Sequence, residues 1–206
     1  MPGGVIMKSR TIWIQQALIE LGIVFTAGAV AGILGFFMGK ENNLESALFF
    51  ISVYGLIMGP ALDPAIFRNP VALALSMGET RKGTCRGLEL TRCIYMCGVM
   101  ALFILTVSIN PFPDVPVWAI LVGYMGILLS ISGISAIFSA LTYQRGSNCV
   151  WLRLLDGVLS ALHIFLLFLF VKYPLSSIAA LAEGLVLMFL SFAIEKKVFL
   201  NWDFRV

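Results

Sequence analysis

Charge is what this sequence has least of. Only 12% of its 206 residues are Asp, Glu, Lys or Arg, whereas 60% are hydrophobic, and the mean hydropathy is +0.97. A water-soluble domain carries about a quarter of its residues as charged side chains. The deficit excludes an ordinary soluble domain, and it leaves apolar runs long enough to cross a lipid bilayer.

Side chains that do chemistry are also scarce. The chain has one histidine and four cysteines, no His-Glu-x-x-His pattern and no paired aspartates. An intramembrane enzyme needs a nucleophile beside a base, or a cluster of metal ligands. The nearest match to a phosphate-binding loop, GFFMGKE at 35–41, is one residue short and carries Glu where Ser or Thr is required. We therefore expect a non-catalytic chain that binds no metal and no ATP of its own.

Six uninterrupted apolar runs are present, and each is near the roughly 20 residues that a helix needs to cross about 30 Å of hydrocarbon. Lipid offers no hydrogen-bond partners, and the runs lack the two-residue alternation of barrel strands, so they predict helices. The predicted fold class is all-α, with 1–206 as a single transmembrane domain. The predicted spans are 21–39, 46–62, 93–109, 117–141, 150–171 and 175–194.

The positions of the basic residues predict the orientation. If the N-terminus, the 63–92 loop, the 142–153 segment and the C-terminus share one side, that side holds every Lys and Arg except Lys40 and Lys172. By the positive-inside rule, both termini are then cytoplasmic in a multi-pass protein of the plasma membrane. The predicted outer loops are short, so specific contacts are expected on the cytoplasmic side.

Residues 1–18 precede the first predicted span and have an amphipathic pattern. Val5, Ile6, Ile12 and Trp13 fall on one side of a helix, opposite polar residues. The pattern favours an elbow helix in the inner interface with Trp13 at headgroup depth, and a disordered tail is the alternative. Spans one and two also share glycine spacings typical of close helix packing.

The 63–92 loop contains a short segment that is apolar on every face. Asn69-Pro70 is a good helix start, and Val71 to Leu75 follow it. Ser76 and Glu79 have capping-box spacing, which predicts a break near Gly78 and a new basic helix leading into the third span. A short apolar helix is not stable alone in water, so it rests in the lipid interface, on its own bundle, or in a partner's groove.

The sequence LALSMGETRKGTCRG, residues 73–87, resembles the first cytoplasmic loop of type-2 ATP-binding-cassette (ABC) transporter permeases. Ser76, Gly78, Thr80, Arg81 and Lys82 match that family's pattern, and Glu79 fills its variable position. The resemblance implies a coupling helix that docks on a separate ATPase. The implied docking residues are Leu73, Leu75, Ser76, Met77, Gly78, Glu79, Thr80, Arg81 and Lys82.

The same resemblance implies partners and a direction of transport. The ATPase subunit holds ATP and Mg²⁺, and a second permease copy, identical or related, completes the pathway. We expect an exporter of an amphipathic or hydrophobic cargo such as a peptide, drug or lipid-like molecule. The chain departs from the family in its small size, with no extra hairpin or domain before the last span.

His163 and Glu183 are expected inside the last two spans, each 8 residues from the outer turn between them. Antiparallel neighbours would bring them to the same depth, within reach of a hydrogen bond. The pair is either a structural clasp or a polar site on a transport path. In the second case the alternative function is a self-contained proton-coupled secondary carrier. Asp156, near Arg153, is expected to form an interfacial ion pair.

Overall fold

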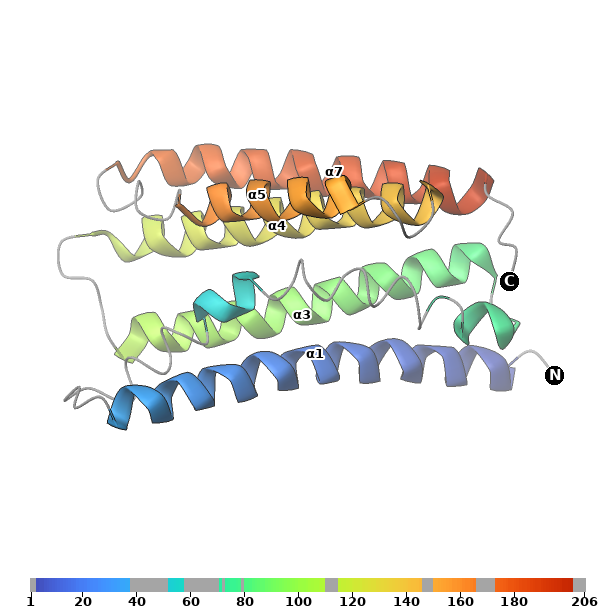
Figure 1. Ribbon diagram of the computed structural model, residues 1–206, viewed down its shortest axis with the longest axis horizontal. Helices are drawn as coiled ribbons and strands as arrows, with labels where there is room; N and C mark the ends of the chain where they lie inside the picture. The colour runs from blue at the N-terminus through green and yellow to red at the C-terminus, as the bar shows by residue number, and fades with distance from the viewer. Residues whose placement is uncertain are drawn as a thin grey trace.

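The computed structural model describes residues 3–37, 52–57, 71, 73–78, 80–109, 115–145, 150–165 and 173–201. Within these residues every regular element is a helix, which confirms the all-α class. Two short helical stretches, at 52–57 and 73–76, accompany five longer helices (Figure 1). The long helices are α1 (Gly3–Phe37), α3 (Arg81–Ile109), α4 (Val117–Arg145), α5 (Val150–Phe165) and α7 (Ser176–Asn201).

Four of these helices are long and apolar enough to cross a membrane. The qualifying stretches are Thr11–Val30, Arg81–Ile109, Val117–Thr142 and Ser176–Val198. α5 has 16 residues, and the remainder of its predicted span lies outside the described part of the chain. The second predicted span is described only at 52–57. The chain is therefore a membrane-embedded helical protein, with four candidate spans in its described part.

α1 joins the predicted elbow and the first span into one helix. It has 35 residues and is about 52 Å long at 1.5 Å per residue. A separate interfacial helix over 1–18 is therefore not confirmed, since one helix covers both the predicted elbow and the first span. The reason is local: residues 14–21 contain no Gly or Pro and are rich in Gln, Ala, Leu and Glu, which favour a continuous helix.

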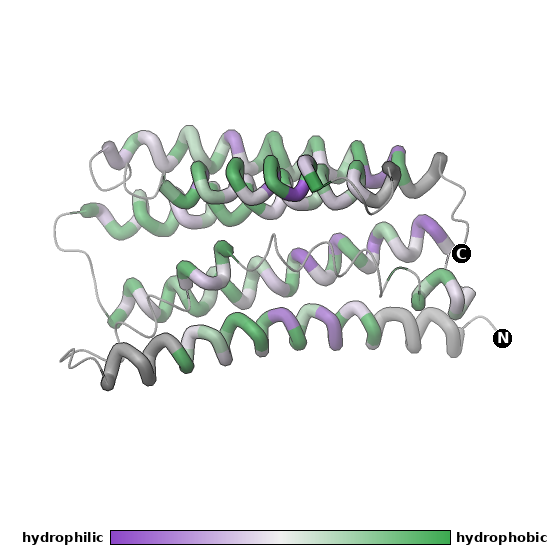
Figure 2. Tube along the Cα trace, in the orientation of Figure 1, coloured by the Kyte–Doolittle hydropathy of each residue, from purple (hydrophilic) through white to green (hydrophobic). Residues whose placement is uncertain are grey.

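The helices form two layers. α1 packs against α3 in one layer, while α4, α5 and α7 form the other, and α3 contacts both α4 and α7 (Figure 1). The N-terminal ends of α1 and α3, the 73–78 segment and the C-terminal end of α7 lie at one end of the molecule. Hydrophilic positions of α3 gather at this end, whereas hydrophobic residues follow every long helix (Figure 2).

We call this end the basic end, because it carries Arg81, Lys82 and Arg86 on α3 and Lys196 and Lys197 on α7. The described parts of the N-terminus, the 63–92 loop and the C-terminus, which the charge distribution predicts on one side of the membrane, are thus at one end of the fold.

Glycines allow a close approach of the backbones of α4 and α7. A Cβ added at Gly126 would lie 2.5 Å from the backbone of Ala180, and one added at Gly184 would lie 2.5 Å from the carbonyl oxygen of Gly126. In lipid, helices gain little from leaving their apolar surroundings, so association depends on such close packing.

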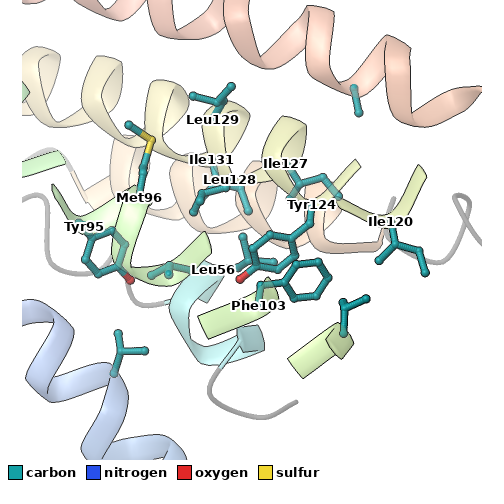
Figure 3. Close-up of a cluster of buried hydrophobic side chains, with 14 of the residues drawn as sticks. Leu56, Tyr95, Met96, Phe103, Ile120, Tyr124, Ile127, Leu128, Leu129 and Ile131 are labelled. Atoms are coloured by element: carbon teal, nitrogen blue, oxygen red, sulfur yellow. The ribbon is translucent and has the colours of Figure 1, made fainter. Parts of the chain in front are cut away.

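Aromatic and polar contacts join the two layers at mid-length. The rings of Phe103 on α3 and Tyr124 on α4 stack with centroids 3.6 Å apart (Figure 3). The Tyr124 hydroxyl donates a hydrogen bond of 2.7 Å to the Ser52 carbonyl oxygen. The Ser52 and Thr106 hydroxyls lie 3.0 Å apart, and Leu56 is fully buried beside them. The 52–57 helix is therefore fixed against both layers.

Candidate functional site

The segment over residues 71–80 has the break that the sequence predicts. The Met77 and Gly78 amides donate hydrogen bonds of 3.0 Å to the Leu73 and Leu75 carbonyl oxygens and close the last turn of the short helix. Gly78 has a φ of 82°, in the left-handed region that favours glycine at a helix end. The short helix is thereby separated from α3.

The start of α3 is capped by Thr80. The Gly83 amide donates to Thr80 Oγ1 at 3.1 Å, and the Thr84 amide donates to the Thr80 carbonyl oxygen at 2.9 Å. Ser76 does not cap α3, because its hydroxyl donates to the Leu73 carbonyl oxygen at 2.8 Å and Gly78 turns the chain between them. The predicted role of Ser76 in a capping box is wrong, and Glu79 lies outside the described residues.

One face of the 71–80 segment is buried against the bundle itself. Val71 and Ala74 are fully buried and join a cluster that draws on α1, α3, α4 and α7, namely Trp13, Leu88, Ala140 and Val198. The segment therefore rests on its own bundle by one face.

The opposite face of the segment is open. Leu73 is 50% exposed, Ser76, Gly78 and Thr80 are exposed, and Leu75 and Met77 are half-buried. In the first turns of α3, Lys82 and Arg86 are exposed and Arg81 is half-buried. An exposed leucine followed by exposed cations is an arrangement suited to a protein contact with an apolar centre and a polar rim.

Trp13 lies beneath this segment. Its side chain is buried, and its indole ring packs directly on Gly87, where no larger residue fits. The Thr91 hydroxyl donates a hydrogen bond of 3.2 Å to the Trp13 carbonyl oxygen. These contacts join α1 to α3 at the place where the short helix rests.

A buried ion pair between α3 and α7 was not predicted from the sequence. Arg92 Nη1 lies 2.7 Å from both carboxylate oxygens of Glu195, and the two side chains are 7% and 0% exposed. A signal for it exists: Arg92 directly precedes the third predicted span, and Glu195 directly follows the sixth. Two opposite charges at the same membrane boundary are natural partners.

The predicted contact between His163 and Glu183 is present. His163 Nε2 lies 3.1 Å from Glu183 Oε1, and His163 Nδ1 lies 2.7 Å from the Leu159 carbonyl oxygen. The imidazole is 12% exposed and the Glu183 side chain is 47% exposed. α5 and α7 both pack on α4 and not on each other along their described lengths, so this pair bridges two helices that are otherwise apart.

The structure gives Asp156 other partners than the expected Arg153. Asp156 is buried, and its carboxylate accepts hydrogen bonds from Ser135 on α4 at 3.3 Å and from Ser160 at 3.5 Å, while Arg153 is exposed. The polar face of α4 supplies the donor that draws the carboxylate inward. Within the described part of the chain, no three His, Cys, Asp or Glu side chains group as metal ligands.

Comparison of the chain with protein-family models, with curated proteins and with solved structures finds no significant match. The local resemblance of residues 73–87 to ABC permeases is therefore the basis for a proposal about function.

Proposed function

We propose that this chain is the membrane-spanning permease subunit of an ABC transporter and that the 71–80 segment is its coupling helix. The observation that carries the proposal is the two-faced burial of that segment. Val71 and Ala74 anchor it to the bundle, while Leu73 stays exposed at the basic end. A coupling helix needs both properties, because it must bind an external protein and move the bundle.

The anchor suits the transmission of force. The residues around Val71 and Ala74 come from α1, α3, α4 and α7, so a push on the segment acts on both layers. The left-handed turn at Gly78 and the cap at Thr80 give the segment a defined angle to α3. A rigid connection of this kind transmits a displacement, whereas a flexible loop would absorb it.

Partner and cargo follow from the resemblance. ATP and Mg²⁺ are held by a separate ATPase, whose docking surface is expected to carry acidic residues opposite Lys82 and Arg86. Two permease copies form the pathway, and the cargo exported is amphipathic or hydrophobic. The second candidate, a self-contained proton-coupled carrier, is favoured by the His163–Glu183 contact and requires no ATPase.

Co-purification tests the proposal. The chain is co-expressed with a candidate ABC ATPase of its source organism, as wild type and as a Leu73→Glu, Lys82→Glu double variant. Leu175→Glu is the matched control, because Leu175 is an exposed leucine at the opposite end of α7. We expect stoichiometric ATPase with wild type and the control, and at least a tenfold loss with the double variant. Absence of ATPase from wild type, or full retention by the double variant, contradicts the proposal.

A further inference from the structure

Glu183 is a carboxylate at the apolar surface of the bundle. It is the only charged residue in the sequence between 176 and 194, and its side chain is 47% exposed. Its exposed neighbours on α7 are Ala179, Ala182 and Val186, so small and aliphatic side chains surround it. A carboxylate in such a place is costly unless its charge is compensated.

The hydrogen bonds of His163 determine how many protons the pair holds. The Leu159 carbonyl oxygen can only accept, so His163 Nδ1 carries a hydrogen and donates it. One more proton must lie between Nε2 and Glu183 Oε1 for their 3.1 Å contact to be a hydrogen bond. With that proton the pair is neutral overall, as imidazolium and carboxylate or as imidazole and carboxylic acid.

Loss of this one proton changes the site in a defined way. The Nε2 lone pair and the carboxylate then face each other, and the site carries one net negative charge at an apolar surface. The charge is again compensated if a monovalent cation binds to the carboxylate. A hydrated inorganic ion would have to shed its water there, whereas an organic cation with apolar substituents keeps favourable contacts with the surrounding aliphatic side chains.

We propose that the His163–Glu183 pair is a binding site for a lipophilic monovalent cation, taken up in exchange for one proton. The protonated pair and the free cation give the cation bound to the Glu183 carboxylate, with neutral His163 and one proton released to water. Charge and atoms balance in this exchange. The site is open to such a ligand because the Glu183 side chain is only half covered.

No other charged group faces the pair closely among the described residues. α4, on which both helices pack, has no charged residue between 117 and 142, and its Tyr124 hydroxyl is bonded to Ser52. On α5, Asp156 accepts a hydrogen bond from Ser135, and it lies about 10 Å along the helix from His163. On α7, Glu195 pairs with Arg92, about 18 Å from Glu183. The exchanged proton therefore belongs to His163 and Glu183.

Binding of tetraphenylphosphonium to the purified full chain in nanodiscs tests the proposal. We expect saturable binding by titration calorimetry, with about one proton released per cation in weakly buffered solution. Glu183→Gln removes the charge at equal size and abolishes the saturable binding. Glu89→Gln, a half-buried carboxylate at the basic end, is the control that retains it.

Two results would overturn the proposal: saturable binding of equal affinity in Glu183→Gln, or wild-type binding that releases no proton. The second result needs no variant, so the test holds even where Glu183→Gln unfolds. Tetraphenylborate, of the same shape and opposite charge, is titrated in a separate experiment and must not bind saturably, since saturable binding of the anion would indicate apolar partition alone. No ATPase is present in the assay, so its outcome is independent of the coupling-helix proposal.

Discussion

At the scale of single residues, the Arg92–Glu195 ion pair is the contact whose disruption has the largest expected effect on stability. Both side chains are almost completely buried, and each compensates the charge of the other. A buried pair often contributes little compared with two apolar residues, but one partner left alone is strongly destabilising. The pair therefore affects stability mainly when one partner is removed, because the other charge is then buried without compensation.

We predict that Glu195→Met alone lowers the free energy of unfolding by about 3–5 kcal/mol, because it leaves the Arg92 charge buried without compensation. The Arg92→Met, Glu195→Met double variant should recover most of that loss. Thermal unfolding of the purified variants in detergent measures both effects. A double variant less stable than Glu195→Met alone would show that the pair itself, and not the leftover charge, dominates.

Sequence reasoning reached some polar contacts at this scale and missed others. The contact of His163 with Glu183 was predicted because counting residues from the expected outer turn places both side chains at the same distance from it on antiparallel helices. Arg92 and Glu195 are 103 residues apart, and no local pattern relates their helices. Ser76 was predicted to cap the helix that leads into the third span, but that cap is Thr80, since spacing alone does not show that the Ser76 hydroxyl bonds back to Leu73 in the short helix.

At the scale of elements, the close contact between α4 and α7 depends on glycines, which have no side chain to separate the helices. Gly126, Gly133 and Gly184 each leave room that the facing backbone occupies. A backbone cannot move aside as the end of a flexible side chain can, so even one methyl group there forces the helices apart.

Gly126→Ala is therefore predicted to destabilise the protein by about 1–3 kcal/mol, the usual cost of overpacking. Gly157→Ala on α5 is the matched control, because a Cβ there meets nothing within 4 Å. It should be neutral or slightly stabilising, since Ala favours a helix more than Gly does. Melting temperatures in the same detergent compare the two variants, and an equal shift in both would contradict the packing argument.

The sequence predicted which elements exist better than how they meet. Long apolar runs predicted helices, because lipid permits few other structures. Glycine spacing directed attention to the first two predicted spans, whereas the described structure has glycines against a facing backbone between α4 and α7. The apolar character of residues 71–75 did not reveal that Val71 and Ala74 are covered by the bundle, since the covering residues come from four separate helices.

At the scale of the whole molecule, the two layers meet along α3 through an ion pair and an aromatic stack. The Arg92–Glu195 pair lies toward the basic end, and the Phe103–Tyr124 stack lies about 16 Å farther along α3. The 71–80 segment is anchored across both layers at that same end. A protein that pushes on this segment is therefore placed to change the angle between the layers, as transport by rocking requires.

Photo-cross-linking tests the docking of an ATPase on this segment most directly. Benzoylphenylalanine is placed at Leu73, exposed at the basic end, and in a second variant at Leu175, exposed at the opposite end. With a candidate ABC ATPase of the source organism co-expressed, we predict a cross-linked permease–ATPase product from position 73 and none from position 175. Cross-linking from neither position, or equally from both, would contradict a coupling role for the 71–80 segment.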